Sequence, residues 1–177
     1  EIGRQIQSSF FPETLPQVSG WEIAVRFQAA RQVSGDFYDV FLLDDDSGLG
    51  FVIADVCDKG VGAALFMGLF RSLIRAFAEL YYGKTIFDLS GTVTGSGAKD
   101  HPIKNSIAEY DHVPALETIL TYTNNYIATN HGKANMFATM FFGIIEPENG
   151  MLFYVNAGHE SVAVVAPNGI RHLLTAT

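Results

Sequence analysis

The sequence has few cysteines and few basic residues, and each shortage excludes a class of protein. Its 177 residues include one cysteine, Cys57, which excludes an internal disulfide framework and favours a reducing compartment. Lysine and arginine number 11 against 19 aspartate and glutamate residues, giving a formal charge of −8 at pH 7. A nucleic-acid-binding protein needs a basic face to neutralise phosphates, and an anionic membrane repels an acidic surface. We therefore expect neither nucleic acid nor a membrane as a partner.

Long hydrophobic runs and a signal peptide are also missing. No apolar run approaches the roughly 20 residues of a membrane span, and no basic segment precedes an apolar one near the N-terminus. A cytoplasmic protein is the default expectation. Apolar residues are nevertheless plentiful, at 48% of a chain about the size of one domain, so one sizeable core can be buried.

The first residues carry a helical pattern that stops abruptly. Ile2, Ile6 and Phe10 recur every four residues, and the stripe ends at Pro12, where a helix cannot easily continue. We expect residues 1–12 to be the end of a linker helix that arrives from upstream, and residues 13–177 to form one domain.

Apolar runs bounded by turn residues predict antiparallel strands in the rest of the chain. The strands are expected at about residues 21–30, 36–43, 50–56, 135–145, 151–156, 161–166 and 170–174. Residues 44–48, 148–150 and 167–169 contain the Asp, Asn and Gly residues typical of short turns.

Two segments have a helical period instead. Over residues 60–81, one apolar face is expected to pack on a sheet: Val61, Ala64, Leu65, Gly68, Leu69, Leu73, Ala76 and Leu80. Further apolar residues on this helix predict contact with a second helix that starts near Pro114. Residues 83–112 between the helices have weak periodicity and are interpreted as a poorly ordered insertion, with a functional loop as the alternative.

Several strands are apolar on both faces although their short turns make them antiparallel, so they need cover on both sides. Two stacked antiparallel sheets with helices on their outer faces meet this requirement. The predicted fold class is therefore α+β, a four-layer αββα sandwich.

Two short acidic segments stand next to predicted strands. Residues 34–39 contain Asp36 beside Gly35, and residues 53–60 contain Asp55 shortly before Gly60. Carboxylates fixed at strand ends, next to glycines that allow close approach, suit hard cations such as Mg²⁺ or Mn²⁺, which prefer oxygen ligands. Asp36 and Asp55 are the first candidates for a metal site.

Taken together, four segments resemble the metal-dependent PPM-type protein serine/threonine phosphatases, in particular the bacterial SpoIIE and RsbU-like branch, whose fold is also an αββα sandwich. In chain order they are Ile6-Gln7-Ser8-Ser9-Phe10-Phe11-Pro12, Val33-Ser34-Gly35-Asp36-Phe37-Tyr38-Asp39, residues 55–65 ending in Gly60-Val61-Gly62-Ala63-Ala64-Leu65, and Asn156-Ala157-Gly158-His159.

The resemblance implies a two-cation site. Asp55 would bridge two Mn²⁺ or Mg²⁺ ions, the backbone carbonyl of Val56 would bind one of them, and Asp36 would hold a metal partly through water. A metal-activated water would then attack phosphorus in line, with no phosphoenzyme. The family pattern places further metal aspartates after the Asn-Ala-Gly-His turn, beyond this sequence. We therefore expect the domain to be incomplete at its C-terminus, and this piece alone to bind metal weakly and turn over poorly.

The resemblance also implies partners. The substrate would be a phosphoserine or phosphothreonine on a small STAS-type anti-anti-sigma protein, whose dephosphorylation releases a sigma factor. Control of the activity is suggested by the N-terminal stripe itself. An upstream sensor or receiver domain would rotate this helix or form a homodimer through it, shift the helix that starts at Gly60, and so move the Val56 carbonyl into or out of metal range. A non-catalytic interaction module with the same fold is the alternative function.

Other residues near the acidic segments have simpler interpretations. Asp39 and Asp58 are candidates for outer metal groups, but aspartates that bond nearby backbone are commoner. Arg31, Lys59 and His159 are interpreted as surface or structural residues, and none is assigned a catalytic role.

A cysteine-dependent phosphatase and a dinucleotide-binding site both fit this sequence poorly. Cys57 is interpreted as a small core residue, because a cysteine phosphatase needs an arginine where Ala63 stands. Gly60 and Gly62 resemble a dinucleotide-binding turn, but Leu65 replaces its third glycine and Asp55 would repel a pyrophosphate.

Overall fold

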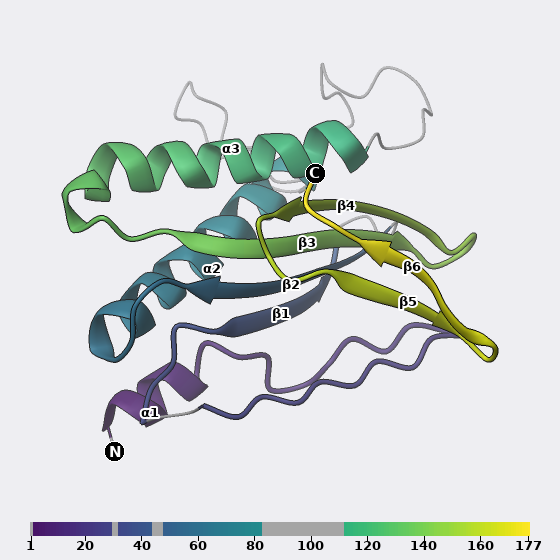
Figure 1. Ribbon diagram of the computed structural model, residues 1–177, viewed down its shortest axis with the longest axis horizontal. Helices are drawn as coiled ribbons and strands as arrows, with labels where there is room; N and C mark the ends of the chain where they lie inside the picture. The colour runs from purple at the N-terminus through teal and green to yellow at the C-terminus, as the bar shows by residue number, and fades with distance from the viewer. Residues whose placement is uncertain (1, 30–31, 44–47, 83–111) are drawn as a thin grey trace, which may run out of the picture.

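The computed structural model describes residues 2–29, 32–43, 48–82 and 112–177 (Figure 1). Arg31, most of the turn expected at residues 44–48 and almost all of the insertion at residues 83–112 lie outside the described residues.

A four-stranded antiparallel sheet forms the centre of the described structure. Its strands are β1 (Phe37–Leu42), β2 (Leu49–Val56), β3 (Ala138–Glu146) and β4 (Met151–Ala157), in that spatial order. Each strand pairs with the next along the chain. The β1–β2 and β3–β4 pairings are those that the turn residues predict, whereas both long helices lie between β2 and β3 in the chain. The backbone N–H of Leu43 donates to the carbonyl of Gly48 at 2.9 Å and holds together the two ends of the β1–β2 connection.

Two long helices cover one face of this sheet. In Figure 1, α2 (Val61–Tyr82) lies behind the strands and α3 (His112–His131) runs along their upper edge, followed by the short helix η1 (Gly132–Ala134). The helices also pack on each other, as predicted: the rings of Phe77 and Tyr122 lie 5.6 Å apart. The hydrophobic core is the layer between this helix pair and the sheet.

The face of α2 that meets the sheet differs from the prediction. Val61 and Leu65, expected to be buried, are 70% and 69% exposed. The buried apolar residues of α2 are Ala63, Met67, Gly68, Phe70, Ile74, Ala78 and Tyr82. The helix is apolar round most of its circumference, so periodicity alone permits more than one buried face. The larger Met67, Phe70 and Ile74 side chains occupy the core instead.

By length and composition alone, α2 could cross a membrane, with 22 residues and a mean hydropathy of 1.5 over its most apolar window. The prediction that no segment reaches this size therefore needs correction. Core helices of soluble proteins pass the same test, and α2 carries Arg71 and Arg75, which form an ion pair with the sheet. We interpret α2 as a core helix.

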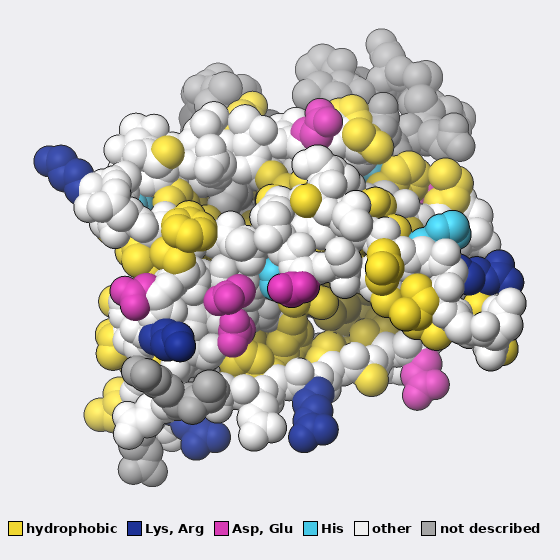
Figure 2. Space-filling model, in the orientation of Figure 1, with side chains coloured by type: hydrophobic (Ala, Val, Ile, Leu, Met, Phe, Trp, Pro, Cys, Tyr) yellow, Lys and Arg dark blue, Asp and Glu magenta, His cyan; other side chains and the backbone are white. Residues whose placement is uncertain are grey.

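The remaining segments are a hairpin beyond the other face of the sheet and an N-terminal segment, in which Phe10, shortly after α1 (Ile2–Ser8), packs against Gly68 of α2. The strands β5 (Val162–Ala166) and β6 (Gly169–Leu174) form a separate antiparallel hairpin, and α1 precedes an extended segment (Figure 1). The strand expected at residues 21–30 is wrong, because no described strand lies alongside residues 21–29 to form a ladder. Figure 2 shows a hollow with hydrophobic side chains on its floor between the body of the molecule and this N-terminal segment.

The predicted class, α+β with antiparallel sheets flanked by helices, is confirmed. Among the described elements, the layers are the helix pair, the four-stranded sheet and, beyond it, the β5–β6 hairpin with the N-terminal segment (Figure 1).

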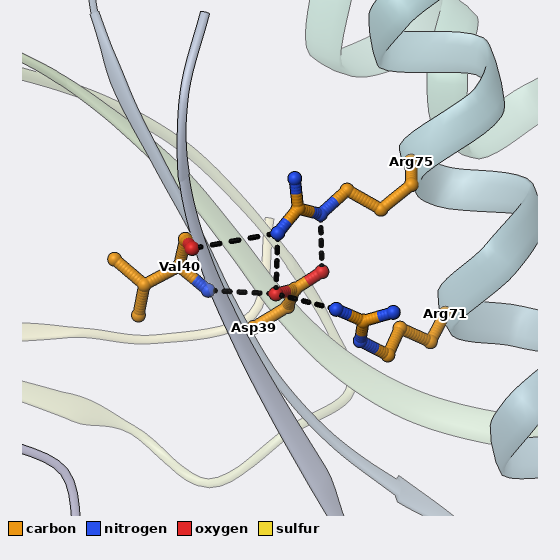
Figure 3. A network of polar contacts seen from close by, with 4 residues as sticks. All are labelled: Asp39, Val40, Arg71 and Arg75. Carbon is orange, nitrogen blue, oxygen red and sulfur yellow. Dashed lines mark hydrogen bonds and ion pairs between the residues drawn. The ribbon is translucent and has the colours of Figure 1, made fainter. Parts of the chain in front are cut away.

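An ion cluster fastens α2 to β1. Asp39 is 1% exposed, and its Oδ1 accepts hydrogen bonds from Arg71 at 3.2 Å and from Arg75 at 2.9 Å, while Oδ2 accepts a further one from Arg75 (Figure 3). Oδ1 also accepts the N–H of Val40 at 3.0 Å, and the Arg75 guanidinium lies 4.2 Å from the ring centre of Phe41. The expected local role of Asp39 is therefore only a small part of what it does. Its main partners are on the helix.

Removing the carboxylate from this cluster should destabilise the domain. In Asp39→Ala, two guanidinium groups remain against the sheet without their anion, and we expect the free energy of unfolding to fall by about 3 kcal/mol. Urea unfolding followed by circular dichroism measures this loss. Glu148→Gln, which changes an exposed carboxylate, is the control and should stay within about 0.5 kcal/mol of wild type. Equal stabilities of the two variants would contradict the account.

Candidate functional site

The strand register brings the two predicted site aspartates together. Asp55 and Thr139 are directly opposite each other on β2 and β3. On β1, Phe37 pairs with Ala54, and continuing this register by one residue sets Asp36 beside Asp55. Because side chains alternate along a strand, all three lie on the face away from the helices, whereas Asp39 points to α2. We call Asp36, Asp55 and Thr139 the site row.

Asp36 is held by its own loop. Its Oδ2 accepts a hydrogen bond from the Ser34 hydroxyl at 2.9 Å, and its backbone N–H donates to Oγ of Ser34 at 3.1 Å. The backbone of Ser34 is hydrogen-bonded to Gln7 of α1. Nε2 of Gln7 donates to the Ser34 carbonyl at 2.6 Å, and Oε1 of Gln7 accepts the Ser34 N–H at 3.0 Å. The sequence pattern assigned no role to Gln7 or Ser34. The only sequence signal for Gln7 is its position next to Ile6 in the apolar stripe, on the side of the helix that can face the domain.

The two carboxyl groups interact directly. Partial burial of the carboxyl raises the pKa of Asp55, and a side-chain hydrogen bond with Asp36 and its negative charge raise it further, while His159 and Lys59 lower it. Since Asp55 remains exposed to solvent, we give most weight to its contact with Asp36. Two carboxyl groups that interact this closely need a proton or a cation between them.

The backbone beside this pair is closely packed. A side chain at Gly35 would place its Cβ 2.6 Å from the carbonyl oxygen of Val56 and 3.2 Å from the Cβ of Ala63. Glycine at position 35 therefore lets the loop before β1 lie against the end of β2 and the first turn of α2. The Val56 carbonyl is next to Asp55 in the chain and next to this glycine in space.

The donor set suits one hard divalent cation. Two adjacent carboxylates are oxygen ligands of the kind that Mg²⁺ and Mn²⁺ prefer. The carbonyl of Val56 is a third oxygen nearby, packed against Gly35 in a residue that is fully buried. Within the described ranges, no three His, Cys, Asp or Glu side chains converge in a metal-binding group. The residues present therefore fit a single cation with few protein ligands better than a complete two-cation site. Acidic side chains gather over this end of the strands in Figure 2.

The other candidates have separate positions. Asp58 has a left-handed backbone with φ of 72°, and its carboxylate accepts the Lys59 N–H at 2.8 Å, which agrees with the turn role expected for it. Cys57 is half-buried rather than in the core, and its sulfur accepts the N–H of Phe137 at 3.2 Å. The ring of His159 contacts Thr139 of the site row, with Nδ1 and Oγ1 3.1 Å apart.

Comparison with known families gives one match over most of the chain. The family model of Stage II sporulation protein E (SpoIIE) matches residues 45–177.

Two curated proteins are similar. Protein IcfG of Synechocystis is 50% identical over 179 aligned residues, covering 100% of this chain and 27% of that protein. Phosphoserine phosphatase RsbU of Bacillus subtilis is 28% identical over 160 residues, covering 90% of this chain and 37% of that protein. The chain thus spans well under half the length of either relative.

Among solved structures, the crystal structure of the RsbU and RsbW domains of Rv1364c from Mycobacterium tuberculosis is similar, with a TM-score of 0.48 and 22% identity. It covers 82% of this chain and 31% of that one.

The interaction between Asp36 and Asp55 predicts a pH dependence of stability in the absence of metal. The folded pKa of Asp55 is raised above its ordinary value of 3.8, so between these two values the folded state binds more protons than the unfolded state. The Asp55 contribution to the free energy of unfolding should therefore fall as pH rises through this window.

Urea unfolding of wild type and Asp55→Asn with a chelator, from pH 3 to pH 7, tests this sign. Because asparagine does not titrate, the variant should gain stability relative to wild type as pH rises. The exposed Glu148→Gln serves as a control and should show no such trend. A stability difference between Asp55→Asn and wild type that stays constant with pH would show that the interaction is absent.

Proposed function

The chain belongs to the SpoIIE family, and from this premise we propose that it is the catalytic domain of a metal-dependent protein serine/threonine phosphatase. The observation that carries the proposal is the contact between the Asp36 and Asp55 carboxyl groups at adjacent strand ends. Similarity to phosphoserine phosphatase RsbU supports a phosphoserine or phosphothreonine substrate. A STAS-type anti-anti-sigma protein in a partner-switching pathway is the substrate we propose.

The residues at the site have distinct roles in this proposal. Asp36 and Asp55 hold Mn²⁺ or Mg²⁺, and the neighbouring carbonyl of Val56 provides a further oxygen. The Ser34 hydroxyl keeps the Asp36 carboxylate turned toward the site. When bound, the cation supplies Lewis-acid polarisation of the phosphoryl group and an activated water. Asp55 lies on the sheet face that helices do not cover and is exposed to solvent, so a phosphorylated side chain of a protein substrate can approach it.

A non-catalytic module in the same pathway is the second candidate. The small number of metal ligands favours this module. In the described part of the chain, no third acidic, histidine or cysteine side chain joins Asp36 and Asp55 in a metal-binding group. Such a module would bind the partner protein without releasing phosphate.

We further propose that a neighbouring sensor or receiver domain controls the site through α1. Ile2 and Ile6 are 74% and 57% exposed, which leaves an apolar stripe for a partner helix or a second copy. The buried Gln7 of the same helix hydrogen-bonds the backbone of Ser34, whose hydroxyl holds Asp36. A movement of α1 would therefore reach a candidate metal ligand through two hydrogen-bonded contacts.

The enzyme proposal is tested by phosphate release from a serine-phosphorylated STAS protein, using the full-length protein that contains this chain. Release should require Mn²⁺ or Mg²⁺ and stop with a chelator. Asp55→Asn and Asp36→Asn should each lower kcat/KM by about 100-fold or more, because a metal contributes several kcal/mol to the transition state. Asp58→Asn, which changes the nearby turn aspartate, is the matched control and should keep most of the activity. Binding of the substrate with no phosphate release at any Mn²⁺ concentration would favour the module instead.

The regulatory proposal predicts that Ile6→Asp in the full-length protein changes its oligomeric state and its regulated activity, because a charge interrupts the apolar stripe. Gln5→Asp introduces the same charge beside the stripe and should have the smaller effect. Light scattering and the phosphate-release assay measure both. If Ile6→Asp leaves both properties unchanged, α1 does not transmit the signal.

A further inference from the structure

His159 stands at the end of the site row in a turn that the fold holds rigidly. Its backbone N–H donates to Oδ1 of Asn156 at 2.8 Å. Asn156 is fully buried, and its own Nδ2 donates to the carbonyl of Leu174 at 3.1 Å. Gly158 has a left-handed backbone with φ of 74° and forms a bridge to Met140 of β3. The turn is therefore fastened both to β3 and to the β5–β6 hairpin.

The imidazole itself is also oriented. Nδ1 of His159 lies 3.1 Å from Oγ1 of Thr139, which is directly opposite Asp55 in the β2–β3 register. The Thr139 hydroxyl can donate to Nδ1, and in that tautomer the ring proton is on Nε2, which is then a hydrogen-bond donor. Within the described part of the chain, Nε2 of His159 has no hydrogen-bond partner. The ring is half-buried.

The position of the ring relative to the acidic pair fits an anionic ligand. His159 lowers the pKa of Asp55, whereas Asp36 raises it, so His159 lies within electrostatic reach of the pair. Lys59, in the loop after β2, also lowers the pKa of Asp55. A phosphoryl group bound at the carboxylates through a cation carries oxygens that need donors on their outer side.

The geometry points to His159 as a further substrate-binding residue, which donates a hydrogen bond from Nε2 to a phosphoryl oxygen, with Thr139 as the residue that positions its ring. This inference rests on the proposed function for its substrate. It reverses the interpretation of His159 as a purely structural residue of the turn.

Two substitutions at the same position separate binding from structure. Asparagine places a polar atom near Nδ1 and can keep the Thr139 contact, but it has nothing near Nε2. Glutamine reaches the Nε2 position with an amide donor. If His159 binds the phosphoryl group, His159→Asn should lower kcat/KM by about 10- to 100-fold, and His159→Gln should recover part of the loss. A structural role predicts the reverse order, because asparagine preserves the contact that fixes the turn.

Inorganic phosphate gives a second readout that does not depend on turnover. Isothermal titration with phosphate in the presence of Mn²⁺, on the full-length protein, should show weaker phosphate binding in His159→Asn and in Thr139→Val. Binding of Mn²⁺ alone should be unchanged in both variants. Thermal unfolding checks that each variant is folded.

The outcomes distinguish this inference from the proposed function. Normal turnover and normal phosphate affinity in His159→Asn would overturn the inference and leave the phosphatase standing. Phosphate binding that depends on His159, in a protein that releases no phosphate from its partner, would support the inference and count against the phosphatase. A wild-type protein that binds Mn²⁺ but no phosphate would overturn the inference.

Discussion

The ion cluster at Asp39 is the constraint on which the rest of the structure depends. Its carboxylate is buried in β1 and ties Arg71 and Arg75 of α2 to the sheet (Figure 3). These contacts determine which face of an almost uniformly apolar helix meets the sheet. The helix begins at Val61, shortly after the end of β2. Ala63 in its first turn then closes against Gly35, beside the carbonyl of Val56.

The two faces of the sheet have different roles. One face carries Asp39 and the apolar core under the helices, and the other carries the site row. Because residues alternate along a strand, Asp36 and Asp39 occur in one short segment and still serve opposite faces. The helix side supplies rigidity, and the open side presents two carboxylates whose mutual repulsion requires a proton or a cation. This division explains how a sheet edge can hold like charges close together without losing its core.

The β1–β2 and β3–β4 pairings, and with the first of them the proximity of Asp36 and Asp55, could be predicted from the sequence, because short turns fix which strands are neighbours. The β2–β3 pairing has no such signal, because both long helices lie between these strands in the chain. Three further features were not predictable by these means. Residues 21–29 have a strand pattern, yet a strand needs a partner and no described strand lies beside them. The buried face of α2 depends on Asp39, whose arginine partners lie 32 and 36 residues away. The contact of His159 with Thr139 spans 20 residues and has no local signal.

The central claim is that Asp36, Asp55 and the Val56 carbonyl hold a divalent cation. A crystal structure of the full-length protein grown with Mn²⁺, with anomalous scattering recorded at the manganese edge, tests it most directly. The account predicts an anomalous peak between the two carboxylates, about 2.2 Å from an oxygen of at least one of them. An anomalous map with no peak at the site row, from a protein that binds Mn²⁺ in solution, would contradict it.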